Sequence, residues 1–174
     1  MSAVPSIAPR RDLDREELRA LVGRLAADPE AWRGLVRRDA AGDERHFEQL
    51  WRDDHVDVWV ISWMDGNDTG FHDHDLSCGA VAVVEGEIIE ERLVLGGPPR
   101  RLRHAAGETF DFDASHVHRM RQDGGSFAVS IHAYSPPLWR MGTYTTGADG
   151  TLRRGSISYA EELRPVEAGD LDAA

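Results

Sequence analysis

The residues most able to carry chemistry lie in the stretch 69–79, where His72 and His74 stand two positions apart after a turn-forming segment. In an extended strand, residues i and i+2 point to the same face, so both imidazoles can reach one metal ion while Asp73 points away. An isolated pair of this kind is a weak signal for a metal site. The rest of the chain must therefore decide its meaning.

A second histidine-bearing stretch, residues 107–119, offers a third ligand. It combines a turn glycine, a short strand and a tight turn, followed by His116 and His118. These two histidines share one strand face, so periodicity does not decide which of them binds. Three neutral imidazoles suit Fe(II), Zn, Cu or Ni. The alternative is that all of these histidines are structural or lie on the surface.

A third stretch places three polar side chains on one strand face. Ser130, His132 and Tyr134 alternate with Ile131 and Ala133, and alternate residues of a strand point the same way. Taken alone, the pattern also fits ordinary buried polar groups that find hydrogen-bond partners in the core.

The N-terminal part of the chain predicts helices that cover a larger domain. Residues 1–11 are typical of a loose tail, and the acidic residues 12–17 predict a helix start with an aspartate cap. A second short helix is expected from Pro29. We expect the helical segment 12–43 to pack on a barrel and the acidic end, 165–174, to form a tail. The apolar residues that recur at helical spacing are Leu18, Leu21, Val22 and Leu25.

From about residue 45 the pattern changes to short segments rich in β-branched and aromatic residues, separated by turns. Short strands without intervening helices favour an antiparallel sandwich or barrel, so the sequence predicts a mainly β domain over residues 44–160. The expected strands are 56–63, 79–84, 88–95, 102–104, 109–112, 117–121, 127–134, 141–146 and 152–158.

Composition limits the kinds of partner. The 174 residues carry a formal net charge of −11, which argues against nucleic acid or an anionic membrane as a partner. A single cysteine, Cys78, excludes an intramolecular disulfide. The sequence contains no apolar run typical of a signal peptide or membrane span, and we expect a cytoplasmic monomer or small homo-oligomer.

Three spaced pieces of the chain together resemble the cysteine dioxygenase (thiol dioxygenase) family of the cupin superfamily. The first runs from Trp63 through the histidine pair to the turn at Gly86, the second is 118–120, and the third is the Ser-x-His-x-Tyr-Ser-Pro-Pro segment 130–137. The resemblance covers about residues 44–160. It implies a cupin-type antiparallel β-barrel, or jelly roll, with the helices N-terminal to it.

The resemblance also implies a site. One Fe(II) per chain would be held by His72, His74 and His118, leaving His116 at the rim. A hydrogen-bonded relay of Ser130, His132 and Tyr134 would act in catalysis, orienting the tyrosine hydroxyl toward bound oxygen or substrate.

The resemblance further implies an activity. Many cupins add a glutamate ligand four or five residues after the second histidine, where this chain has Cys78 and Gly79. Three neutral imidazoles leave Fe(II) its full charge and open positions for a thiolate and O2. The expected reaction adds both atoms of O2 to the sulfur of a small thiol, converting L-cysteine to cysteine sulfinic acid. The alternatives are 3-mercaptopropionate or another small metabolite as the substrate, or a non-catalytic metal-binding cupin.

Two departures from the family pattern carry further expectations. Mammalian members crosslink a cysteine to the relay tyrosine, but Gly79 stands at that position and the pleat sends Cys78 to the opposite face, so no Cys–Tyr crosslink is expected. The arginine that binds the substrate carboxylate is replaced by Gln49, which cannot form a bidentate charged pair. Arg140 and Arg119 are then the candidate substrate-binding residues beside Gln49.

Overall fold

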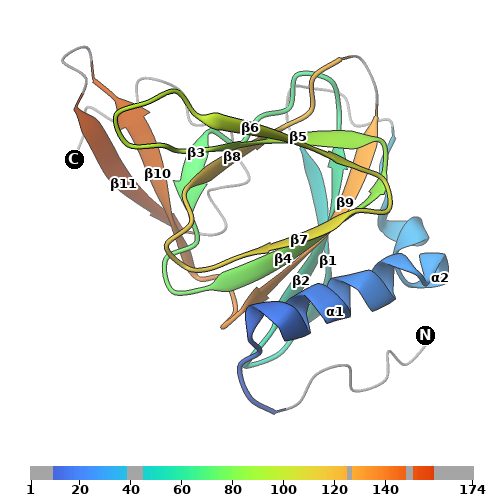
Figure 1. Cartoon of the computed structure of the whole chain (residues 1–174). Coiled ribbons are helices and arrows are strands. Elements are labelled where there is room, and N and C mark those ends of the chain that lie inside the picture. The colour runs from blue at the N-terminus through green and yellow to red at the C-terminus, as the bar shows by residue number, and fades with distance from the viewer. Residues whose placement is uncertain (1–9, 39–44, 125–126, 148–150, 159–174) are drawn as a thin grey trace.

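Two antiparallel sheets face each other in the computed structural model, which describes residues 10–38, 45–124, 127–147 and 151–158 (Figure 1). The mainly β prediction is confirmed. The strands are β1 (His46–Arg52), β2 (Asp57–Trp63), β3 (Phe71–Asp73), β4 (Cys78–Glu85), β5 (Glu87–Arg92), β6 (Arg100–Ala105), β7 (Thr109–Phe112), β8 (His118–Arg121), β9 (Ala128–Ser135), β10 (Arg140–Thr146) and β11 (Leu152–Ser158).

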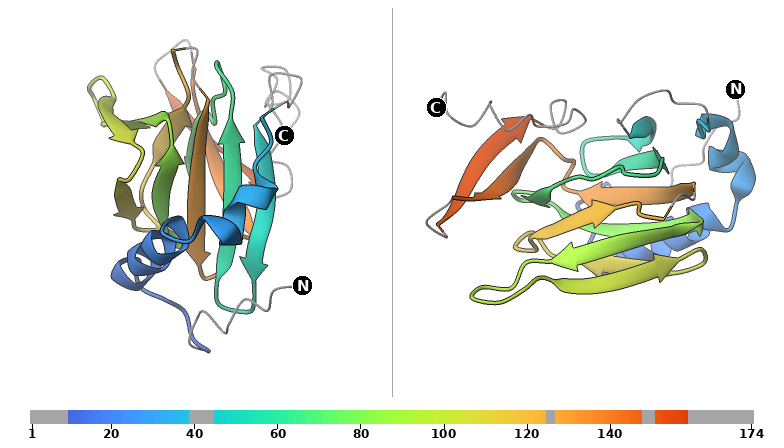
Figure 2. Two further views of the ribbon diagram at one scale, coloured as in Figure 1. Left: turned by 90° about the vertical axis from the view of Figure 1, so that its right-hand side faces the viewer. Right: turned by 90° about the horizontal axis from the view of Figure 1, so that it is seen from above.

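The chain crosses repeatedly from one sheet to the other, which gives the two sheets a barrel-like arrangement. One sheet runs β1-β2-β9-β4-β7 and the other β11-β10-β3-β8-β5-β6. Figure 2 shows the two sheets from the side and from above. Their inner faces enclose an apolar core, and strands β3, β8 and β9 all border it. The buried residues of this inner core include Trp63, Val81, Val83, Ile88, Phe110, Phe112, Met120 and Met141.

The helices cover the outer face of the five-stranded sheet (Figure 1). Helix α1 (Arg15–Ala26) is capped by Asp14 in a capping box. The Asp14 carboxylate accepts from the backbone N–H of Glu17, and the Glu17 carboxylate accepts from the backbone N–H of Asp14. Short α2 (Pro29–Trp32) continues into a 3-10 turn, η1 (Arg33–Leu35). The predicted apolar stripe of α1 is buried, in one cluster with Val58 and Val60 of β2. Because β4 lies between this cluster and the inner core, it is buried on both faces.

Several boundaries differ from the sequence predictions. The strand expected over 88–95 ends at Arg92, because Leu95 is exposed and Gly96 takes a positive φ of 73° in a turn. The predicted tails and the end of the helical segment fall largely on residues 1–9, 39–44 and 159–174, which lie outside the described residues. Within the described part of the chain, no helix is long and apolar enough to cross a membrane.

Candidate metal centre

Three buried imidazoles converge at the inner face of the six-stranded sheet. His72 lies in β3, His74 follows that strand directly, and His118 begins β8, opposite His72 in the strand pairing. Each is at most 3% exposed, and one ligand atom from each lies within 4.8 Å of the others. Asp73, between the two histidines, points away from them, as its place in the strand predicts.

Hydrogen bonds fix which nitrogen of two of these rings faces the centre. Nδ1 of His118 lies 2.9 Å from Glu90 Oε1, and Nδ1 of His72 lies 3.1 Å from the carbonyl oxygen of Gly70. Both partners are acceptors, so each Nδ1 carries the hydrogen and each Nε2 keeps its lone pair. The Nε2 of His118 is buried with no hydrogen-bond partner among the described residues. A metal ion would satisfy it, so the donor set fits a metal.

Burial keeps these imidazoles neutral, which is the form that binds a metal. It lowers the pKa of His72, His74 and His118 below the ordinary value, in each case as the largest cause. For His118 the adjacent Glu90 carboxylate acts in the opposite direction and moderates the decrease. All three nitrogen donors are therefore available at neutral pH without proton loss.

Glu90 is a fully buried carboxylate that sequence reasoning missed. Its carboxylate accepts hydrogen bonds from His118 and His116 at 2.9 Å and from His104 at 3.1 Å. Burial acts to raise its pKa, but the hydrogen bonds from the three histidines outweigh this and lower the pKa. His116 thus faces Glu90 at the edge of the trio His72, His74 and His118. The available signal was an acid within an apolar strand, directly after Ile88 and Ile89.

The alternating residues of β9 form a continuous hydrogen-bonded chain. Ser130 Oγ lies 2.7 Å from His132 Nε2, and His132 Nδ1 lies 3.2 Å from the hydroxyl of Tyr134. All three side chains are buried, and burial lowers the pKa of His132 to about 3, so its ring is neutral. The ring centroid of Tyr134 is 5.2 Å from that of His74. The chain therefore ends beside the three converging histidines.

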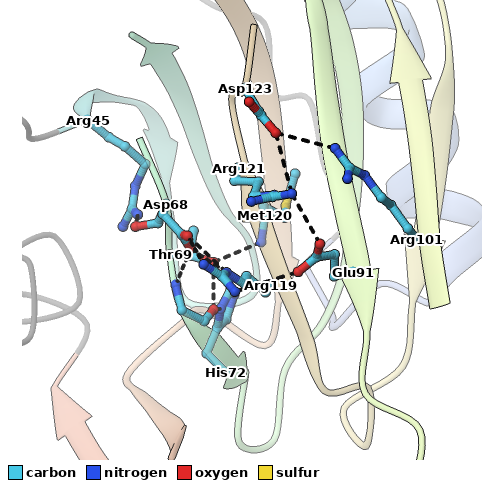
Figure 3. Close-up of polar contacts among 11 residues, drawn as sticks. Arg45, Asp68, Thr69, His72, Glu91, Arg101, Arg119, Met120, Arg121 and Asp123 are labelled. Atoms are coloured by element: carbon cyan, nitrogen blue, oxygen red, sulfur yellow. Dashed lines mark hydrogen bonds and ion pairs between the residues drawn. The ribbon is translucent and has the colours of Figure 1, made fainter. Parts of the chain in front are cut away.

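A small cavity of about 30 Å³ opens on both groups. Its cationic wall residue is Arg45, which sequence reasoning did not select and which stands directly before β1, two positions before the lining residue Phe47. The guanidinium of Arg45 donates to the carbonyl oxygen of Asp68 at 2.7 Å and lies 5.5 Å from the centroid of Trp63 (Figure 3). The other lining residues are Phe47, Trp59, Ile61, Trp63, Thr69, His72, His118, Met120, His132, Tyr134 and Leu138.

The three residues expected to bind substrate do not line this cavity. Arg119 turns toward the carboxylates of Asp68 and Glu91 (Figure 3). The side chain of Arg140 is 68% exposed and lies 3.7 Å from Asp75. The amide of Gln49 donates to Asp57 at 3.0 Å and is exposed. Strand direction explains Arg119, since it alternates with His118 and so faces the other side of β8.

Gly79 and Cys78 lie on opposite faces of β4. A Cβ atom on Gly79 would stand 2.4 Å from the ring of Phe112 and 3.1 Å from that of Tyr134. The Cys78 thiol instead lies 3.2 Å from the backbone oxygen of Ser135, on the helix-covered side. The strand thus holds the cysteine sulfur away from the tyrosine.

Comparison with solved structures shows the fold. A Thermus thermophilus protein, TT1209, is 16% identical, covers 60% of this chain and 92% of its own, and gives a TM-score of 0.52. A Klebsiella pneumoniae protein described by its double-stranded beta-helix domain is 15% identical, with coverage of 71% and 92% and a TM-score of 0.50. A recombinant oxalate oxidase in complex with glycolate is 16% identical, with coverage of 62% and 59% and a TM-score of 0.52. The predicted cupin-type barrel with N-terminal helices is confirmed.

A family model gives a more specific match than the fold. It is described as cysteine dioxygenase type I and matches residues 2–146, which include the three converging histidines, the Ser130–Tyr134 strand and Arg45. The match extends further toward the N-terminus than the resemblance found in the sequence motifs, and it takes in the helical cover. Since it spans most of the 174 residues, the chain belongs to the cysteine dioxygenase type I family.

Proposed function

We propose that this protein is an iron(II)-dependent thiol dioxygenase that converts L-cysteine to cysteine sulfinic acid. The reaction joins one thiol and one O2, and both oxygen atoms end on sulfur, so no further reductant is needed. The observation that carries the proposal is the convergence of three neutral imidazoles, with no carboxylate among them, beside a cavity that His72 and His118 line together with the Tyr134 end of the Ser130–His132–Tyr134 chain.

The charge of the donor set supports a thiolate ligand. His72, His74 and His118 would hold the iron through uncharged nitrogens, so its full positive charge remains to be balanced by an anion. When bound, iron would supply a site that favours the thiolate form of the substrate and brings O2 next to sulfur.

The chain's own residues would orient the substrate. Tyr134 presents its hydroxyl from the cavity wall, held by His132. Arg45 would bind the substrate carboxylate, because it is the arginine among the lining residues and an arginine pairs with a carboxylate through two parallel hydrogen bonds. The apolar lining, including Phe47, Trp59 and Ile61, would exclude water from the reacting sulfur.

Oxygen consumption by the Fe(II)-loaded protein tests the proposal. L-cysteine, 3-mercaptopropionate, cysteamine and homocysteine are supplied in turn, and the product is identified by mass. We expect uptake with L-cysteine and a product heavier by two oxygen atoms. Faster turnover of 3-mercaptopropionate would make that thiol the substrate and leave the proposed reaction unchanged. No oxygen uptake with any of these thiols would contradict the proposed dioxygenase activity.

Replacing Arg45 by glutamine tests its role toward the carboxylate. We expect Arg45→Gln to raise the KM for L-cysteine by about 10- to 100-fold, because a charge-assisted pair contributes roughly 1.5–3 kcal/mol. The KM for cysteamine, which has no carboxylate, should change little. Arg140→Gln is the control, since that side chain is exposed outside the cavity. Equal effects of Arg45→Gln on both thiols would rule out carboxylate recognition by Arg45.

A further inference from the structure

The hydrogen-bonded chain on β9 begins at a residue of the neighbouring strand. The indole Nε1 of Trp63, at the end of β2, lies 2.9 Å from Ser130 Oγ, and both side chains are fully buried. An indole N–H donates and cannot accept. This contact therefore has one possible direction, from Trp63 to Ser130.

The direction of this bond determines the direction of the next bond, between Ser130 and His132. Ser130 Oγ accepts from Trp63, and its own hydrogen has one acceptor among its described contacts, His132 Nε2 at 2.7 Å. If His132 carried its hydrogen on Nε2 instead, two donors would face the serine oxygen and the serine hydrogen would be left without an acceptor in a fully buried place. Such an unsatisfied buried group is costly, so the hydrogen of Ser130 points to His132.

The same reasoning gives the donor and the acceptor in the bond between His132 and Tyr134. Because burial lowers the pKa of His132 to about 3, its ring is neutral and carries one hydrogen. With Nε2 acting as the acceptor, that hydrogen lies on Nδ1 and is donated to the Tyr134 oxygen 3.2 Å away. Tyr134 thus accepts from His132, so its own hydroxyl hydrogen is not used in this bond, and the tyrosine side chain lines the cavity.

We propose that Trp63 is a positioning residue that fixes the direction of the whole chain, so that Tyr134 acts toward the cavity as a hydrogen-bond donor. A donor at this position suits a ligand that presents oxygen lone pairs, such as a carboxylate or an oxygen atom being transferred. The histidine tautomer follows from the contacts and the neutrality of the buried ring, whereas its effect on turnover rests on the proposed function.

The tautomer can be measured without any turnover. Nitrogen-15 NMR of histidine-labelled protein, loaded with diamagnetic Zn(II), distinguishes Nδ1–H from Nε2–H, and His132→Gln assigns the signal. We expect the Nδ1–H form of His132 in the wild type. In Trp63→Phe, the serine oxygen loses its indole donor, so a hydrogen on His132 Nε2 can replace that donor and an Nε2–H population should appear. An Nε2–H wild type, or an unchanged Trp63→Phe spectrum, would overturn the proposal.

A second tryptophan provides the matched control. Trp59 also lines the cavity from β2, but its indole is hydrogen-bonded to Asp57, away from Ser130. Trp59→Phe should leave the His132 tautomer unchanged. In the Fe(II) enzyme, Trp63→Phe should lower kcat about three- to tenfold, as expected for the loss of one oriented hydrogen bond, with a smaller change in KM. If no thiol is turned over at all, the NMR comparison still decides the role of Trp63.

Discussion

At the scale of single residues, the orientation of the third histidine depends on a carboxylate in another strand. Glu90 of β5 holds Nδ1 of His118 and leaves Nε2 facing His72 and His74. Outer partners of metal-binding histidines fix the tautomer and ring orientation, and their loss weakens metal affinity about 10- to 100-fold. We therefore expect Glu90→Gln to weaken Zn(II) binding by this factor, measured by competition with a chromophoric chelator.

The adjacent residue gives the control for this experiment. Glu91 lies next to Glu90 in β5 but faces the other side, where it contacts Arg119 and Arg121 (Figure 3). Glu91→Gln removes the same charge one position away and should leave Zn(II) affinity unchanged. Equal losses in the two variants would mean that overall charge, and not the bond to His118, sets the affinity.

The residues found from sequence and those missed differ in one physical respect. His72, His74 and the set Ser130, His132 and Tyr134 follow from the period of two within a strand. Glu90 and Arg45 reach the site only because β5 pairs with β8 and because β1 pairs with β2, and no local period encodes such pairing. Most strands could be predicted from the chain, although β1 was not, whereas these cross-strand neighbours could not.

At the scale of elements, the short strand β3 is held in place by a hairpin that follows it by about 70 residues. Asp73 accepts from the guanidinium of Arg154 in β11 at 2.7 and 2.9 Å and from the hydroxyl of Tyr144 in β10 at 2.7 Å. The backbone N–H of Gly142 adds a further bond at 3.1 Å. Because Asp73 stands between His72 and His74, these bonds fix the segment that carries both histidines.

Removing the arginine should loosen β3 without unfolding the barrel. The side chain of Arg154 is 41% exposed, so the pair contributes less than a buried one and the stability loss should be about 1 kcal/mol. We expect Arg154→Gln to weaken Zn(II) binding several-fold while the melting temperature changes by only a few degrees. Arg153→Gln, at the exposed preceding position of the same strand, should change neither quantity. A large loss of stability with intact metal affinity would contradict this role for the hairpin.

At the scale of the whole molecule, the barrel buries imidazoles among apolar side chains. His72, His74, His118 and His132 are each at most 3% exposed, and burial is the largest cause that lowers the pKa of every one of them. Burial keeps these nitrogen donors neutral, the form that binds a metal. It also means that these histidines bind protons less readily in the folded metal-free protein than in the unfolded chain.

This difference predicts how the stability of the metal-free protein depends on pH. The unfolded chain binds a proton at each histidine near pH 6.5, whereas folded His132 does so only near pH 3. Between these values the unfolded state binds more protons, so the free energy of unfolding falls as the pH falls. From pH 7.5 to 5.5, His132 alone should remove roughly 1 kcal/mol, because one pH unit corresponds to about 1.4 kcal/mol per group.

Urea unfolding of the metal-free protein at pH 7.5, 6.5 and 5.5 measures this slope, with His132→Gln as the comparison. The variant should lose about 1 kcal/mol less than the wild type over the same interval, whatever its absolute stability. Carboxylates such as Asp68, whose pKa is lowered by its bond to Arg119 although burial opposes the change, affect stability only at lower pH. The difference in slope between the two proteins therefore isolates His132, and parallel slopes would show that folded His132 is protonated as readily as in the unfolded chain.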